Sequence, residues 1–234
     1  MHDRHQPEKR NRKKKYVESP ESGGKILNIL DAEQRKGYGV IEAHALTILL
    51  GEAGTGKTLL AVYYALDKLL KDEIQKIIIT RPTFSEHTIG FLPGTVNEKM
   101  MLYVMPMVAN MYRCIDQRSK IEYFMRSGII EIIPQEFIRG VTINDGVMIV
   151  DEAQNCNNKE LKTIGTRIGV GGKLIICGDK NQVDLRDSKY SGLQRLVGFA
   201  ERQDERDAAV YELHNNHRHP VVQRLVKYYE GFPE

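Results

Sequence analysis

The sequence predicts a single α/β domain in which helices cover both faces of a mostly parallel β-sheet. Short apolar runs alternate along the chain with longer segments that are rich in helix formers. Runs such as 77–79 and 147–150 are apolar at every position, which is typical of strands buried on both faces of a parallel sheet. Polar residues follow these runs directly, at the sheet edge where α/β proteins bind ligands. The 234 residues suffice for one such domain.

The first third of the chain predicts a helix over 25–43, a strand over 44–50 and a helix over 59–66. The strand is a short apolar run, and the helix after it consists mainly of residues with high helix propensity. Three consecutive isoleucines predict a strand over 75–80. Pro82 ends this strand, because proline cannot donate a hydrogen bond to a neighbouring strand.

The middle third predicts a tight apolar turn over 90–94, one helix over 96–125, and strands over 128–134 and 146–150. The helix carries six of the eight methionines. Methionines at helical spacing lie either in a core or at a subunit contact, and we favour a subunit contact here. These methionines are Met100, Met101, Met105, Met107, Met111 and Met125.

The last third continues the alternation, with helices over 159–168, 189–201 and 220–230 and strands over 173–177 and 208–213. The three cysteines are odd in number and far apart in sequence. We therefore expect reduced thiols rather than a disulfide framework or a zinc site. The cysteines are Cys114, Cys156 and Cys177. Cys177 ends an apolar predicted strand, and its small side chain is suited to burial.

A glycine-rich turn between a predicted strand and a predicted helix is the strongest functional signal. The glycines let the backbone curl so that its N–H groups converge on an anion, and the helix N-terminus adds partial positive charge. Lys57 is placed to reach the β- and γ-phosphates of ATP, and the Thr58 hydroxyl is placed to ligate Mg²⁺. The turn is therefore predicted to be a phosphate-binding P-loop made of Gly51, Glu52, Ala53, Gly54, Thr55, Gly56, Lys57 and Thr58.

Two acidic residues follow the apolar strand over 146–150. Asp151 can hold Mg²⁺, directly or through water, and Glu152 can accept a proton from an attacking water. Past the next strand, the Gln182 amide can sense the γ-phosphate. Arg218 can neutralise charge that develops in phosphoryl transfer. The predicted catalytic residues are therefore Lys57, Glu152, Gln182 and Arg218, and the predicted metal ligands are Thr58 and Asp151.

Two further polar residues are open to more than one interpretation. Gln34 lies ahead of the P-loop, where a side-chain amide could read the adenine edge through a paired donor and acceptor. Without further context, the interpretation of Gln34 as a plain surface residue is favoured. Arg81 follows the strand over 75–80 and could contact a nucleotide or nucleic acid, or form a structural ion pair.

Positive charge is concentrated at the N-terminus. Residues 1–15 hold seven basic and two acidic side chains, which leaves 27 basic and 29 acidic side chains in the remainder. We expect residues 1–24 to form a disordered basic tail and residues 25–234 to form the folded domain. The basic cluster over 9–15 could contact nucleic-acid phosphates, or it could only increase solubility.

No apolar run approaches the length that a membrane-spanning helix needs. The charged N-terminus also lacks the apolar segment of a secretory signal. We therefore expect a cytoplasmic protein that does not bind membranes.

Several motifs occur together in a fixed order, and in this order they resemble the PhoH-like ATPase family, which is related to the superfamily 1 helicase core. The resemblance covers roughly 25–231. It implies a RecA-like P-loop NTPase domain, ATP and Mg²⁺ as ligands, and a link to RNA. It also implies the site roles given above and aligns Gln34 with an adenine-side glutamine. The motifs are Gly51 to Thr58, Thr80-Arg81-Pro82, Gly90 to Gly94, Asp151 to Asn155, Thr166 to Gly169, Gly178-Asp179, Gln182 to Leu185, and Arg218-His219-Pro220.

Two stretches depart from the family pattern. The run over 83–88 replaces an acidic Glu-Ala-Gly-Glu-like sequence. The run over 139–142 reads Arg-Gly-Val-Thr and lacks the second arginine of Arg-Gly-Arg-Thr. Substrate handling, or the arginine that acts between subunits, can differ accordingly.

About eighty residues follow Asp151, too few for a second core of the kind that completes the ATP site in related helicases. The second wall must then come from the end of this chain or from a neighbouring subunit. We expect a homo-oligomeric ring, a hexamer, in which Arg218, Arg167 or Arg139 completes the site.

The leading hypothesis is Mg²⁺-dependent ATP hydrolysis coupled to single-stranded nucleic acid, with RNA favoured over DNA. The alternative is a nucleotide-gated nucleic-acid-binding module without productive turnover. A small-molecule kinase fits poorly, because no stretch resembles a lid for an acceptor.

Overall fold

The computed structural model describes residues 24–82, 96–180, 191–202 and 206–230. Four of the predicted features lie outside the described residues. They are the tail up to residue 23, the run over 83–88 that differs from the family pattern, the turn over 90–94, and Gln182.

Six strands form one sheet in the order β3-β2-β4-β5-β1-β6, and every neighbouring pair is parallel. The mostly parallel sheet is therefore confirmed. All strands end at the same edge, and β5 separates β1 from β4. The strands are β1 (Leu46–Leu50), β2 (Lys76–Thr80), β3 (Ile130–Ile132), β4 (Gly146–Val150), β5 (Lys173–Gly178) and β6 (Ala208–Glu212).

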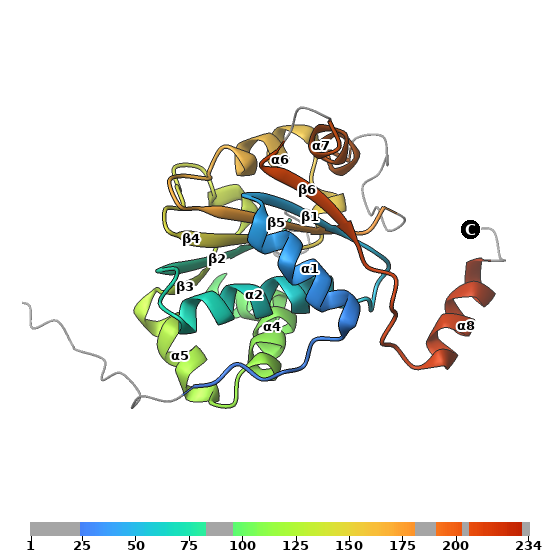
Figure 1. Ribbon diagram of the computed structural model, residues 1–234, viewed down its shortest axis with the longest axis horizontal. Coiled ribbons are helices and arrows are strands. Elements are labelled where there is room, and N and C mark those ends of the chain that lie inside the picture. The colour runs from blue at the N-terminus through green and yellow to red at the C-terminus, as the bar shows by residue number, and fades with distance from the viewer. Residues whose placement is uncertain (1–23, 83–95, 181–190, 203–205, 231–234) are drawn as a thin grey trace, which may run out of the picture.

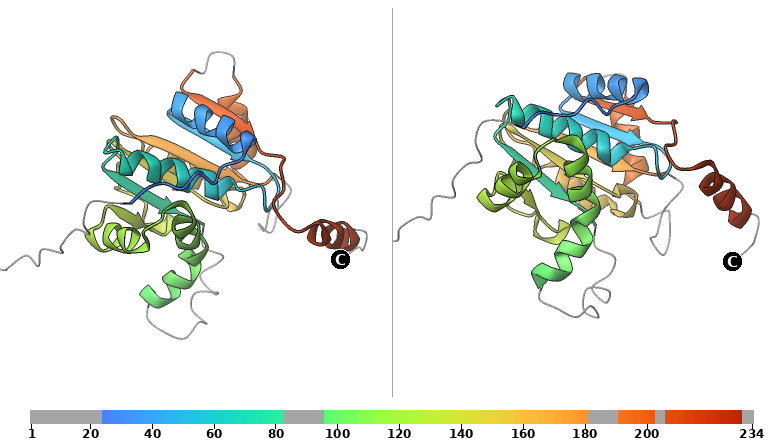
Figure 2. Two further views of the ribbon diagram at one scale, coloured as in Figure 1. Left: turned by 60° about the horizontal axis from the view of Figure 1, so that its bottom comes forward. Right: turned by 90° about the horizontal axis from the view of Figure 1, so that it is seen from below.

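Helices cover both faces of this sheet (Figure 1). One face carries α1 (Ala32–Ala43), α2 (Lys57–Leu70), α4 (Val96–Cys114) and α5 (Arg118–Ser127). The other face carries α6 (Asn158–Gly165) and α7 (Leu193–Ala200). The final helix, α8 (Pro220–Glu230), stands away from both layers (Figures 1 and 2). Two short 3-10 turns, Gln135–Phe137 and Ala153–Asn155, complete the described elements.

The two helical layers explain why the strands are apolar at every position. On β4, Val147 and Ile149 pack into the core under α2, whereas Met148 and Val150 pack into the core under α6. Successive side chains of a strand point to opposite faces, so a strand covered on both faces buries all of them. In the described part of the chain, no helix has both the length and the apolar character needed to span a bilayer.

The predicted helix over 25–43 is wrong in its start, because α1 begins only at Ala32. The Asp31 side chain accepts a hydrogen bond from the Gln34 N–H (2.7 Å), and Gln34 Oε1 accepts one from the Asp31 N–H (3.2 Å). This reciprocal capping box defines a helix N-terminus. Residues before it run in an extended path, where the Leu27 N–H donates to the Cys114 carbonyl oxygen (2.8 Å).

The single helix predicted over 96–125 is two helices, α4 and α5, and the chain turns between them. The expected methionine contact with another subunit is wrong for Met107 and Met111, which are buried in the core of their own chain. Met125 is partly buried against the same core, and Met105 is 45% exposed. The side chains of Met100 and Met101 lie outside the described set.

The three cysteines are buried as free thiols, as expected for Cys177. Burial raises the pKa of each thiol, to about 12 for Cys114. Such thiols are inert packing groups rather than nucleophiles.

Candidate active site

The loop over 51–56 curls at the carboxyl end of β1, immediately before α2. Gly51, Gly54 and Gly56 have φ angles of 149°, 98° and 83°, which L side chains rarely adopt. A Cβ atom at Gly51 would lie 2.4 Å from the Leu213 carbonyl oxygen, and one at Gly56 would lie 2.4 Å from Gln34 Nε2. Gly56 precedes α2 and no described side chain caps this N-terminus, which leaves a loop and helix dipole suited to an anion.

The Lys57 ammonium lies within the curl of this loop. Its Nζ donates to the carbonyl oxygens of Gly51 (2.7 Å) and Glu52 (3.0 Å). Both partners are neutral, and no carboxylate of the described residues forms an ion pair with it. The positive charge therefore remains available for a bound phosphate.

Thr58 and Asp151 meet although they are far apart in sequence. The Thr58 hydroxyl donates to Asp151 Oδ1 (2.7 Å) at the carboxyl end of β4. Burial raises the pKa of Asp151 above its ordinary value, and the hydrogen bond from Thr58 acts in the opposite direction. A hydroxyl and a carboxylate oxygen are hard ligands of the kind that Mg²⁺ prefers, so this pair fits the predicted ion.

Glu152 has a strained backbone, with φ 52° and ψ 39° in the left-handed region. Its Oε2 accepts a hydrogen bond from Gln154 Nε2 (2.6 Å), and its Oε1 lies 3.6 Å from Arg81 Nη2. Gln154 is buried, and its Oε1 accepts from the Asp179 N–H (3.1 Å). The Glu152 carboxylate is thus held from two sides. The structure gives Arg81 the ion pair that was one of its two interpretations.

Sequence reasoning missed Gln154 as a site residue. The sequence signal for Gln154 is an amide two positions after Glu152, the second of the two acidic residues that follow a buried strand.

The segment over 213–219 returns across the P-loop after β6. Asn216 Nδ2 donates to the Ala53 carbonyl oxygen (3.2 Å), and the His217 N–H donates to the Gly54 carbonyl oxygen (3.1 Å). The next residue, Arg218, packs so closely that a Cβ atom at Gly54 would lie 2.7 Å from its Cγ. Arg218 therefore lies beside the loop of its own chain.

Three polar side chains join α1, the P-loop and this returning segment. Gln34 is buried, and its Nε2 lies 3.4 Å from both the Thr55 carbonyl oxygen and His217 Nε2. His217 Nε2 in turn lies 3.2 Å from Asp31 Oδ2. Partial burial acts to raise the pKa of Asp31, but hydrogen bonds from Gln34 and Asn215 outweigh it and the pKa is lowered. Gln34 is thus not a plain surface residue.

A cavity of about 360 Å³ unites most of these groups, within the range of small-molecule sites. Two α4 residues that line it, Asn110 and Arg113, were not candidates from the sequence, since a helix face 50 residues away carries no local signal for the site. The predicted residues that line the cavity are Gln34, Ala53, Gly54, Gly56, Lys57, Thr58, Asp151, Glu152 and Arg218.

The other two candidate arginines lie away from this cavity. The Arg167 carbonyl oxygen accepts from the Ile143 N–H (2.9 Å), just ahead of β4, at the sheet edge opposite the P-loop. Arg139 lines a separate cavity of about 330 Å³ together with Thr163 and Glu160. Neither arginine lines the P-loop cavity of its own chain.

The all-parallel sheet, the glycine loop after β1 and the acidic pair after β4 define a RecA-like P-loop NTPase. The model of the PhoH-like protein family matches residues 27–230, and the chain belongs to this family.

A PhoH-like protein of Synechocystis sp. is 38% identical over 210 residues, which are 88% of this chain and 63% of the relative. A PhoH-like protein of Bacillus subtilis is 35% identical over 208 residues, which are 88% of this chain and 65% of the relative. The chain thus spans less than two thirds of the length of these relatives.

Among solved structures, the large terminase of a thermophilic bacteriophage in complex with ADP has a TM-score of 0.50 at 12% identity. The match covers 87% of this chain and 50% of the terminase. At this level of identity the likeness concerns the fold alone.

Proposed function

We propose that this chain hydrolyses ATP with Mg²⁺ and couples the reaction to single-stranded nucleic acid, with RNA favoured over DNA. The observation that supports the proposal most is the juxtaposition of two groups in one cavity. These are the Lys57 ammonium in the glycine loop, which no described carboxylate neutralises, and the Thr58–Asp151 pair. A nucleoside triphosphate requires two elements in its site, a cation for the phosphate oxygens and oxygen ligands for Mg²⁺.

Binding would use the loop N–H groups and Lys57 for the β- and γ-phosphates, and Thr58 and Asp151 for the ion. When bound, Mg²⁺ neutralises charge on phosphate oxygens. Glu152 would accept the proton of the attacking water, with Arg81 and Gln154 orienting its carboxylate. Arg218 would neutralise charge that develops on the transferred group. Gln182, which lies outside the described residues, keeps its proposed role as a γ-phosphate sensor.

Gln34 would read the adenine edge. Its place in the cavity lining beside the P-loop supports this role. The Nε2 group would donate to the base, since Oε1 already accepts a hydrogen bond from the Asp31 N–H. The coupling to RNA is supported by the motif order, which resembles that of the PhoH-like ATPase family, and by the basic residues over 9–15.

The test is steady-state phosphate release from ATP, with and without single-stranded RNA and single-stranded DNA. We expect Mg²⁺-dependent turnover that RNA stimulates at least threefold and DNA stimulates less. In the same assay, GTP should compete poorly with ATP, and Gln34→Ala should reduce this preference. Nucleotide binding without phosphate release would instead favour the nucleotide-gated binding module. Equal rates in all arms would refute the coupling to nucleic acid.

We also propose that the chain assembles into a hexameric ring in which a neighbour closes the site. The exposed stripe on α8 supports this, since Val221, Leu225 and Tyr228 are 50%, 54% and 63% exposed and share one helix face. Arg167 lies at the edge opposite its own P-loop, so a head-to-tail arrangement could bring it to the site of the next subunit.

Light scattering of the protein with an ATP analogue and Mg²⁺ should give a mass near six times 26.7 kDa, and Leu225→Asp should lower it. Mixing the Lys57→Ala and Arg167→Ala variants should restore part of the activity that each lacks. In mixed rings, a Lys57→Ala subunit supplies its intact Arg167 to the intact P-loop of an Arg167→Ala subunit. The same mixture with Arg139→Ala identifies the arginine if Arg167 is not the one. A monomer that hydrolyses ATP at full rate would disprove the ring.

A further inference from the structure

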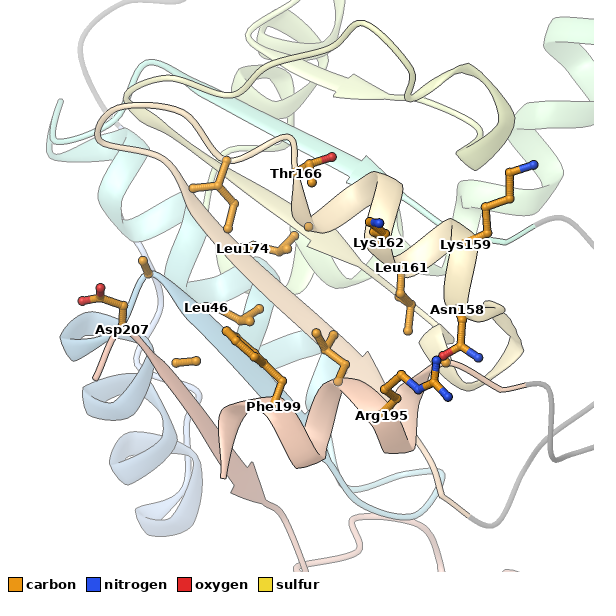
Figure 3. Close-up of a pocket in the computed structure, with 16 residues that line it drawn as sticks. Leu46, Asn158, Lys159, Leu161, Lys162, Thr166, Leu174, Arg195, Phe199 and Asp207 are labelled. Atoms are coloured by element: carbon orange, nitrogen blue, oxygen red, sulfur yellow. The ribbon is translucent and has the colours of Figure 1, made fainter. Parts of the chain in front are cut away.

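A second cavity, of about 860 Å³, lies on the sheet face that α6 and α7 cover, away from the P-loop (Figure 3). Leu46 and Leu174, near the beginnings of β1 and β5, line it from the strands. Leu161 of α6 and Leu196 and Phe199 of α7 line it from the helices, and Phe199 is 43% exposed. We call this cavity the α6–α7 groove. Its lining is mainly apolar, so an occupant gains most by burying apolar side chains there.

Cations border the same groove. Lys159 and Lys162 of α6 and Arg195 of α7 line it and are exposed. None of the three forms an ion pair with any residue in the described part of the chain. Figure 3 places the one acidic lining residue, Asp207, at the end opposite Lys159 and Arg195. The groove therefore combines an apolar floor with a positively charged border.

The positive charge of the border disfavours two segments of the same chain as occupants, the basic N-terminal stretch and α8. The residues over 1–15 carry seven basic side chains against two acidic ones, and α8 exposes Arg224 beside its apolar stripe. Either segment would bring positive charge to a positive border. A single strand of RNA would satisfy the cations, but it would find one aromatic ring, Phe199, for stacking and few polar groups for its base edges.

We propose that the α6–α7 groove binds an amphipathic helix of a partner protein, with apolar residues on one face and Asp or Glu along both flanks of that face. The apolar stripe packs against Leu161, Leu196 and Phe199, as in other helix-in-groove complexes. The flanking carboxylates lie against Lys159, Lys162 and Arg195, which fixes orientation and accelerates association.

The probe is a fluorescein-labelled peptide of about 18 residues, with Leu and Phe at helical spacing and Glu on both flanks. It is added to the full-length protein and followed by fluorescence anisotropy. Binding should occur in the micromolar range and weaken with salt. It should weaken at least tenfold when Lys replaces Glu in the peptide, and also in the Phe199→Ser and Arg195→Glu variants. The matched control Phe137→Ser changes an exposed phenylalanine outside the groove, and this variant should bind the probe as the parent does. Unchanged ATP hydrolysis and thermal unfolding show that each variant is folded.

Four results would overturn the proposal. A scrambled peptide of the same composition binds equally well, or both groove variants bind the probe like the parent. Single-stranded RNA displaces the probe, and Arg195→Glu weakens RNA rather than peptide binding, which would make RNA the occupant. Phe199→Ser abolishes self-association, which would make a second copy of this chain the occupant.

Discussion

The Lys57→Ala variant is expected to hydrolyse ATP slower by a factor on the order of 10²–10³ and to bind ATP at least tenfold more weakly. Lys57 Nζ is held by two carbonyl oxygens of the loop, 2.7 Å and 3.0 Å away, and no described carboxylate neutralises it. Alanine removes the ammonium that lies within the curl of the loop. The backbone N–H groups remain, and they alone must then hold the phosphates.

The measurements are titration with a fluorescent ATP analogue and steady-state phosphate release. The matched control is Lys36→Ala, which removes an exposed lysine of α1 that makes no described contact. The fold should survive Lys57→Ala, because the carbonyl oxygens of Gly51 and Glu52 lie in a solvent-accessible loop and can hydrate. Thermal unfolding checks this. ATP affinity and turnover that both stay at the parent level would refute a nucleotide role for the loop.

The P-loop could be predicted from the sequence because its chemistry is contiguous. The glycines at 51, 54 and 56 adopt positive φ angles that the pattern itself demands. The meeting of Thr58 with Asp151 could also be predicted, although 93 positions separate them. Both follow strands of one parallel sheet, and parallel strands end at a common edge.

The contacts of the returning segment over 213–219 could not be predicted. Asn216 and His217 bind carbonyl oxygens of the loop, 163 positions away in the case of Asn216 and Ala53. Every loop residue has a carbonyl oxygen, so no residue type marks where such a contact will form. Asp31 is different, because its capping pair with Gln34 is a readable signal, and it also marks the true start of α1.

The burial of Met107 and Met111 follows from the way α4 packs in the fold. A methionine stripe gives a helical period, but the period is the same whether the stripe meets a neighbour or its own sheet. Here α4 packs on α2, and the stripe faces the core of the same chain. The sequence pattern therefore predicts a buried helix face, but it does not determine whether that face packs against the same chain or against another subunit.

The Glu152→Gln variant is expected to lose ATP turnover by a factor on the order of 10²–10⁴ while its affinity for ATP stays within about threefold of the parent. Glutamine keeps the size of the side chain and can still bond to Gln154, but it cannot accept a proton at neutral pH. The left-handed backbone at this residue also persists, since glutamine and glutamate have the same preference for it. A strained residue at the carboxyl end of β4 is the kind of outlier that a functional site maintains.

Affinity for ATP and turnover must be measured on the same preparation, because the prediction is that turnover falls while affinity is retained. A loss of both would point to a disturbed loop rather than a lost base. The matched control is Glu122→Gln, which changes an exposed glutamate on α5 in the same way. Loss of the carboxylate also removes the partner of Arg81, so Arg81→Ala is tested alongside. If Arg81 only orients the carboxylate, its removal should cost much less turnover than Glu152→Gln. Turnover by Glu152→Gln within about threefold of the parent would refute the assignment of Glu152 as the base.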